Sequence, residues 1–114
     1  MQYHFEATLS ASDVKRHLPH PFTVPAHSGQ VRIELHFTPE KVGDIRNMLT
    51  LTLFDPHGFR GAGHRGGNTH VVEITPAAAT PGYIAGAIPA GEWNAQIDTH
   101  MVMPGEPCPY QMTV

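Results

Sequence analysis

Hydrophobic and polar residues alternate along most of the chain, which is the pattern of β-strands with one face in a core. In the clearest run, residues 31–38, every second side chain is apolar, and Pro39 ends the pattern. The same period of two predicts further strands over residues 3–9, 48–54, 69–75, 93–101 and 110–114.

Turn-forming residues separate these runs. The 11 glycines and 11 prolines are spread along the chain and give a turn signal about every ten residues. Residues 18–25 hold three prolines and are predicted to be an edge strand or an extended crossing, the polar residues 40–47 a loop, and residues 84–88 a short strand. Helical periodicity of useful length is absent. The pattern predicts an all-β fold, an antiparallel β-sandwich of about eight strands with Greek-key or jelly-roll connections, in one domain over 1–114.

The alternation also predicts which side chains form the core. Trp93 is the expected centre, because one large aromatic residue often anchors a sandwich of this kind. The other residues expected in the core from their place in the alternation are Leu51, Leu53, Ile33 and Leu35.

A glycine-rich segment, residues 55–67, follows the strand 48–54. Its glycine density predicts an irregular loop that lets another group approach closely. The side chains that could bind an anion or a carbohydrate there are Arg60, His64, Arg65 and His57. The structural alternative is that Arg60 pairs with Asp55 or Asp98 and fixes the loop on the sandwich.

The charge, the spacing of the histidines and the surroundings of the serines argue against several functions. The net charge is −3 and lysine and arginine do not cluster, which argues against nucleic acid as a partner. The nine histidines lack the spacing of a metal site, and no serine lies in a Gly-x-Ser-x-Gly motif. We therefore expect no metal, no cofactor and no catalysis by this domain alone.

Cysteine usage and the first residues bear on location. Cys108 is the single cysteine, so an internal disulfide is excluded, which suits a reducing compartment. Residues 1–20 contain charged side chains and no apolar stretch of signal-peptide type, and no run approaches the length of a membrane span. We expect a cytoplasmic protein without membrane contact.

Several turn motifs occur in a distinctive order. They are Pro21-Phe22-x-Val24-Pro25, Asp55-Pro56-x-Gly58-Phe59-Arg60-Gly61, Arg65-Gly66-Gly67, Ala79-Thr80-Pro81-Gly82-Tyr83 and Ile88-Pro89-x-Gly91-x-Trp93. In this order and spacing the chain resembles the N-terminal β-sandwich of CehA/McbA-type PHP (polymerase and histidinol phosphatase-like) metallohydrolases. In that family the catalytic barrel follows the sandwich, and its metal site opens with a His-x-His motif that this chain lacks.

The resemblance implies a non-catalytic accessory or interaction module. Its partner would be a PHP catalytic domain in the same or another chain, or a second copy in a homo-oligomer, with residues 55–67 and 79–83 near the contact. An apolar patch, for which Phe54, Phe59 and Tyr83 are candidates, would favour this hypothesis. The alternatives are a β-sandwich that binds a carbohydrate or an anion through the 55–67 loop, and a hydrolase whose catalytic part lies outside this chain.

Overall fold

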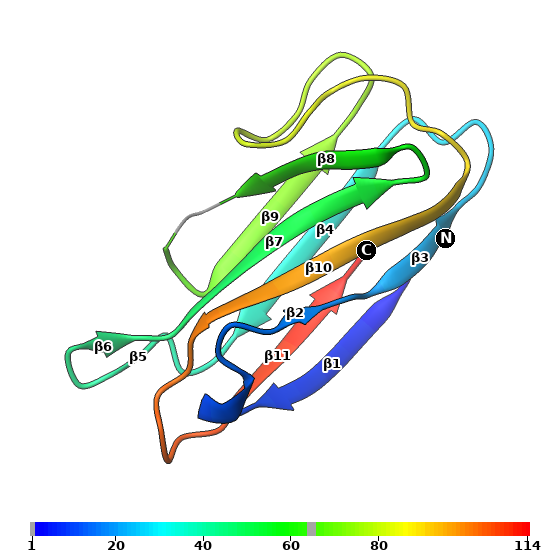
Figure 1. Ribbon diagram of the computed structural model, residues 1–114. Helices are drawn as coiled ribbons and strands as arrows, with labels where there is room; N and C mark the ends of the chain where they lie inside the picture. The colour runs from blue at the N-terminus through cyan, green and yellow to red at the C-terminus, as the bar shows by residue number, and fades with distance from the viewer. Residues whose placement is uncertain (1, 64–65) are drawn as a thin grey trace.

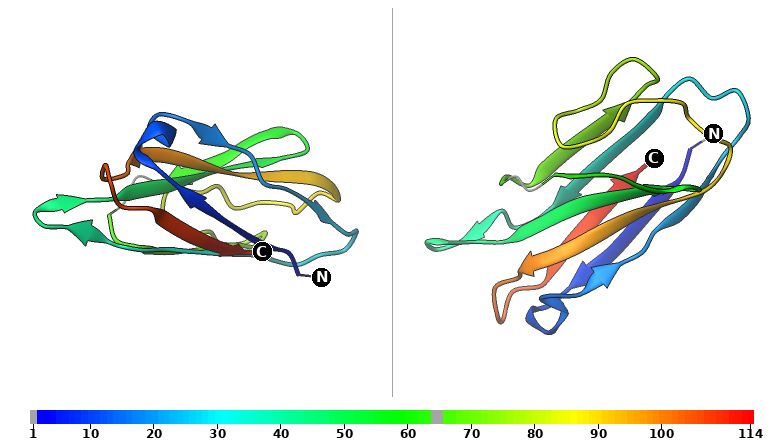
Figure 2. Two further views of the ribbon diagram at one scale, coloured as in Figure 1. Left: turned by 90° about the horizontal axis from the view of Figure 1, so that it is seen from below. Right: turned by 45° about the horizontal axis from the view of Figure 1, so that its top comes forward.

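Two antiparallel sheets stack face to face in a computed structural model that describes residues 2–63 and 66–114. The first sheet contains, in spatial order, β1 (His4–Leu9), β11 (Cys108–Thr113), β4 (Val31–Phe37) and β9 (Thr69–Ile74). The second sheet contains β2 (His17–Leu18) and β3 (Pro21–Val24), both paired with β10 (Gly91–Met101), followed by β7 (Met48–Asp55) and β8 (Gly58–Gly63). Figures 1 and 2 show the two layers. The predicted all-β sandwich is confirmed, whereas the Greek-key or jelly-roll connection stays a prediction.

The core lies between the two sheets, as the alternation predicts. Along β4 every second side chain is buried, from Val31 to Phe37. Trp93 of β10 is completely buried and contacts Phe22 of β3, with 6.2 Å between the ring centroids. The buried residues also include the other four that the sequence placed in the core, Leu51, Leu53, Ile33 and Leu35.

The strand inventory corrects the sequence analysis. The described part of the chain holds eleven strands rather than about eight. The short pair β5 (Lys41–Val42) and β6 (Ile45–Arg46) lies where a loop was predicted, and residues 84–88 do not form a strand. Within the described residues, the helical structure consists of one 3-10 turn, Ala11–Asp13.

The largest correction concerns residues 58–63, which were predicted to be irregular and form strand β8. A tight turn joins β8 to β7, because Oδ1 of Asp55 accepts hydrogen bonds from the backbone N–H groups of His57 and Gly58. Gly58 and Gly61 have φ angles of 133° and 124°, which glycine adopts readily. Gly58 and Gly61 therefore lie in a hairpin strand rather than in a loop.

Different contacts join the two sheets along the two long sides of the sandwich. On one side the connecting segment, residues 75–90 between β9 and β10, bridges the edges of β8 and β9 (Figure 1). On the other side, ring side chains in or next to β1 contact ring side chains in or next to β3. Ring centroids are 6.1 Å apart between Tyr3 and Phe22, and 5.1 Å apart between Phe5 and His20.

His20 joins the two sheets inside this aromatic side. It is buried, its Nδ1 lies 3.1 Å from the carbonyl oxygen of Ala95 in β10, and its Nε2 lies 2.7 Å from the hydroxyl of Tyr110 in β11. A carbonyl oxygen only accepts, so Nδ1 carries the proton in the neutral ring and Nε2 accepts from the tyrosine hydroxyl. Burial lowers the pKa of His20 below its ordinary value of 6.5.

We expect the free energy of unfolding to fall as the pH drops below 6.5, because the unfolded chain binds the His20 proton more tightly than the folded chain does. The contribution of His20 to the free energy of unfolding is complete above pH 6.5. It is lost as the pH falls through the lowered pKa that His20 has in the folded state. Urea unfolding of the wild type and of His20→Gln at several pH values between 7.5 and 5, roughly the range in which histidine titrates, measures it. An identical pH dependence in both proteins would exclude His20 as the cause.

Candidate functional site

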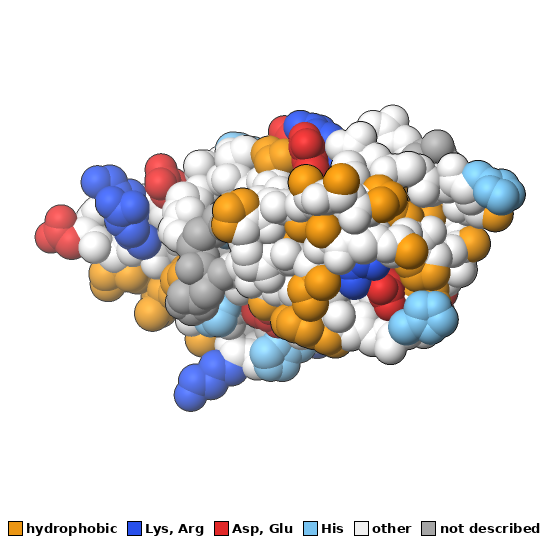
Figure 3. Space-filling model, turned by 90° about the horizontal axis from the view of Figure 1, so that it is seen from above, with side chains coloured by type: hydrophobic (Ala, Val, Ile, Leu, Met, Phe, Trp, Pro, Cys, Tyr) orange, Lys and Arg blue, Asp and Glu red, His pale blue; other side chains and the backbone are white. Residues whose placement is uncertain are grey.

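An apolar surface covers β8 and the connecting segment. Residues 75–90 contain no acidic, basic or histidine side chain. Among the large hydrophobic residues of the described chain, Phe59 on β8 is 57% exposed and Ile84 on the segment is 49% exposed. Figure 3 shows hydrophobic side chains across the middle of this face. We call the exposed side chains of Phe59, Ile84 and the surrounding alanines and prolines of residues 75–90 the apolar surface.

Backbone hydrogen bonds hold the connecting segment against the edge of β8. The N–H of Ala62 donates to the carbonyl of Gly82 at 3.1 Å, and the N–H of Ile84 donates to the carbonyl of Arg60 at 2.9 Å. This close approach requires glycine both in β8 and in the connecting segment. A Cβ atom at Gly61 would lie 2.4 Å from Cα of Tyr83, and one at Gly82 would lie 2.7 Å from the carbonyl oxygen of Ala62.

The side chain of Arg60 also holds the connecting segment, through hydrogen bonds to its backbone. This side chain is 7% exposed and forms an ion pair with Asp55 at 3.1 Å. The guanidinium also donates to the backbone carbonyls of Ile84 at 2.9 Å, Gly86 at 3.3 Å and Ala87 at 2.8 Å. Its central carbon lies 5.3 Å from the centroid of the Trp93 ring.

Most of the hydrogen-bonding capacity of the Arg60 guanidinium is therefore used within the protein. Four of its hydrogen bonds to protein acceptors are seen, out of about five that a guanidinium can donate. The structural alternative of the sequence analysis is confirmed for Asp55, and Asp98 lies elsewhere, bonded to His17.

Of the other three predicted binding residues, the structure describes His57 alone. His57 is exposed at the β7–β8 turn, where its backbone N–H donates to Asp55. His64 and Arg65 lie outside the described residues. Binding of an anion or a carbohydrate by this group stays a prediction.

The three candidates for an apolar patch differ in how much of each side chain is exposed. Phe59 is exposed, whereas Phe54 is half-buried against it, with ring centroids 6.2 Å apart. Tyr83 is also half-buried and donates its hydroxyl proton to the carbonyl of Leu51 at 2.8 Å. Sequence reasoning missed Ile84, although the uncharged run 75–90 was a signal that could have indicated it.

Comparison of the chain with protein-family models, curated proteins and solved structures found no match. Within residues 2–63 and 66–114, no three side chains among histidine, cysteine, aspartate and glutamate group in a way that could hold a metal ion. Over the same ranges, none of the helical structure has the length and apolar character needed to cross a bilayer.

A polar network occupies the outer face of the second sheet. The Asp98 carboxylate accepts hydrogen bonds from Thr52, from Gln96 at 2.8 Å and from His17 at 2.6 Å. Burial alone would raise the pKa of Asp98, but the hydrogen bonds from Thr52, His17 and Gln96 outweigh it and lower the pKa below its usual value. The network ties the short strand β2 to β10.

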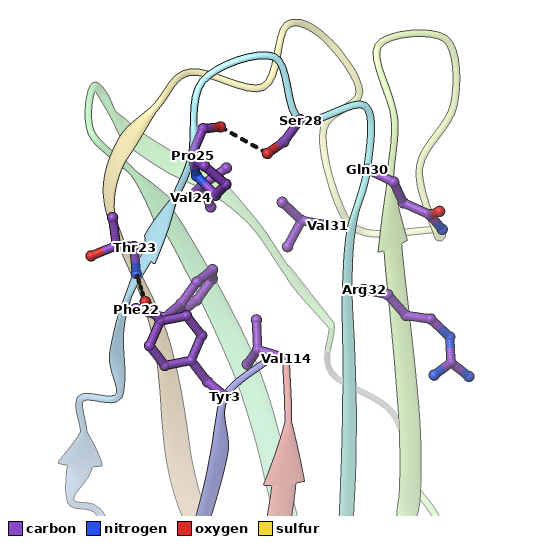
Figure 4. Close-up of a pocket in the computed structure, with 10 residues that line it drawn as sticks. All are labelled: Tyr3, Phe22, Thr23, Val24, Pro25, Ser28, Gln30, Val31, Arg32 and Val114. Carbon is purple, nitrogen blue, oxygen red and sulfur yellow. Dashed lines mark hydrogen bonds between the residues drawn. The ribbon is translucent and has the colours of Figure 1, made fainter. Parts of the chain in front are cut away.

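A cleft of about 260 Å³ opens at the end of the sandwich between β3 and β4 (Figure 4). Apolar side chains of Phe22, Val24, Val31 and Val114 point into it, whereas Arg32 points away. Arg32 bonds instead to carboxylates of Glu73 and Glu34. The cleft thus offers a small ligand apolar contact and little polar recognition.

Proposed function

We propose that this protein is a non-catalytic interaction module whose apolar surface packs against a partner domain. The observation that carries the proposal is the uncharged connecting segment, hydrogen-bonded along β8, with Ile84 of the segment and Phe59 of β8 exposed. An exposed apolar patch rimmed by polar residues is typical of a protein–protein interface. Pre-organisation by Arg60 and by the two close-packed glycines lowers the ordering cost of binding.

We further propose that the partner is a PHP-type catalytic domain in the same or another chain. The motifs that carry the resemblance support this, because 55–61 and 79–83 are also the segments that build and position the apolar surface. The proposed location is the cytoplasm. In support of it, the sequence has a single cysteine, Cys108, which is unpaired, and this suits a reducing compartment.

Site-specific photocrosslinking in cells tests the proposal. The photoreactive residue p-benzoylphenylalanine is placed at Phe59 or at Ile84, and the crosslinked peptides are identified by mass spectrometry. Ile45 is the matched control, since it is 43% exposed but lies on the β5–β6 pair, outside the apolar surface.

We expect positions 59 and 84 to crosslink to the same partner and position 45 to give none of that product. Peptides from a PHP domain with a His-x-His motif would support the proposed partner. Equal crosslinking from all three positions, or none from 59 and 84, would refute the interface.

A further inference from the structure

The edge of β1 differs from the other edges of the sandwich. The edge of β8 is covered by residues 82–84, and β9 receives a bond from the N–H of Thr80 to the carbonyl of Glu73. The β2–β3 edge contains Pro19 and Pro21, which carry no N–H, and the N–H of Thr23 donates to the hydroxyl of Tyr3. In the described chain no such cover lies along β1.

The register of β1 shows which of its backbone groups are unpaired. Tyr3 and Val114 exchange two hydrogen bonds, of 3.0 and 2.9 Å, and the pairing continues without a bulge. Every second residue of an antiparallel strand bonds to the same neighbour. The backbone groups of His4, Glu6 and Thr8 therefore point away from β11 toward solvent.

An edge strand with free donors and acceptors, without proline, lysine or a bulge, is a template for another strand. β1 has these properties, and its inward side is not fully covered either, since Phe5 is half-buried and Ala7 is exposed. We propose that β1 pairs antiparallel with β1 of a second copy of this chain, which joins the two first sheets into one continuous sheet.

Polar complementarity favours one register of this pair. In the single chain His4 Nε2 already lies 3.3 Å from the Glu6 carboxylate, and a two-fold axis beside Phe5 places His4 opposite Glu6 of the second copy, twice by symmetry, so that imidazoles and carboxylates alternate across the pair. The neighbouring register, with the axis beside Glu6, would place two carboxylates opposite each other and is disfavoured.

The same register also complements the apolar side of the strand. The two Phe5 rings lie opposite each other in a non-hydrogen-bonded pair, where cross-strand side chains are closest. Tyr3 of one copy lies over Ala7 of the other, which is exposed in the single chain. Both matches favour a second copy over an unrelated peptide.

The interface proposed here does not depend on the apolar surface. β1 and β9 form opposite edges of the first sheet, and the apolar surface lies on the β8–β9 side (Figure 1). Ile84→Asp should leave the β1 dimer intact, and a block of β1 should leave crosslinking from positions 59 and 84 intact.

Sedimentation velocity over a wide range of concentration tests the dimer. We expect the wild type to reach twice its 12.5 kDa mass. Glu6→Pro removes an outward N–H without removing a bond to β11, so it should weaken association by about tenfold or more while the melting temperature is kept. Glu6→Gln, which keeps the N–H, should weaken it less. A wild type that is monomeric throughout, or a Glu6→Pro variant that associates as well as the wild type, would overturn the proposal.

Disulfide crosslinking tests the register. The wild-type cysteine, Cys108, is buried, so the introduced thiols report on β1. Phe5→Cys should form an intermolecular disulfide on oxidation, because paired Cα atoms about 4.5 Å apart suit a disulfide. Ala7→Cys, the matched control, should not. Crosslinking of Ala7→Cys instead would overturn the register. If Phe5→Cys does not fold, Glu6→Pro still tests whether β1 forms the dimer contact.

Discussion

Arg60→Met is expected to destabilise the fold by about 3–5 kcal/mol, because it leaves a buried carboxylate without its partner. The side chain of Asp55 is 9% exposed, and one of its oxygens faces the guanidinium at 3.1 Å. The substitution also frees the carbonyls of Ile84, Gly86 and Ala87. Urea unfolding followed by circular dichroism measures the loss.

Two further variants make the result specific to the buried charge. Asp55→Asn combined with Arg60→Met should recover part of the stability, because the amide oxygen can still accept the turn N–H groups of His57 and Gly58. Arg32→Met is the matched control. Arg32 also pairs with carboxylates, but its side chain is 51% exposed, so the unfolding midpoint should hardly change. Similar losses at the two arginines would contradict the role assigned to Arg60.

The sandwich was predictable because its central strands bury one face each. β4, β7 and β10 show the period of two directly in their side chains, and their core residues were identified without the structure. β8 was not predictable in this way. Three of the six residues of its sequence, GFRGAG, are glycine, and glycine carries no side chain that could show a period. Its pairing with β7 depends on the Asp55 turn.

The candidate site was only partly predictable, because long-range contacts create it. The pairing of Arg60 with Asp55 spans five residues and could be anticipated. The bonds of Arg60 to residues 84–87 span more than twenty and leave no local pattern. For the same reason residues 84–88 were predicted to be a strand from their apolar character, whereas bonds to β8 hold them as an irregular segment with Ile84 outward.

Gly61→Ala is the second substitution for which we expect a large loss, about 3 kcal/mol or more. One part is backbone strain, since φ at Gly61 is 124° and a side chain in such a conformation costs about 1–3 kcal/mol. The other part is steric. The new Cβ would lie 2.4 Å from Cα of Tyr83, which is backbone and cannot move away as a flexible side chain could.

Gly58→Ala separates these two contributions. Gly58 lies in the same strand with a similar φ of 133°, but a Cβ there would meet no atom within 4 Å. It should therefore show the strain alone, and Gly61→Ala should cost about 1–3 kcal/mol more. Hydrogen exchange locates the difference, because the amides of Ala62 and Ile84 bond across the contact and should exchange faster only in Gly61→Ala. Equal losses and equal exchange in the two variants would mean that the segment does not depend on this close approach. Selective exposure of the two amides would show that the glycine keeps the apolar surface in place, since Ile84 itself carries one of the bonds.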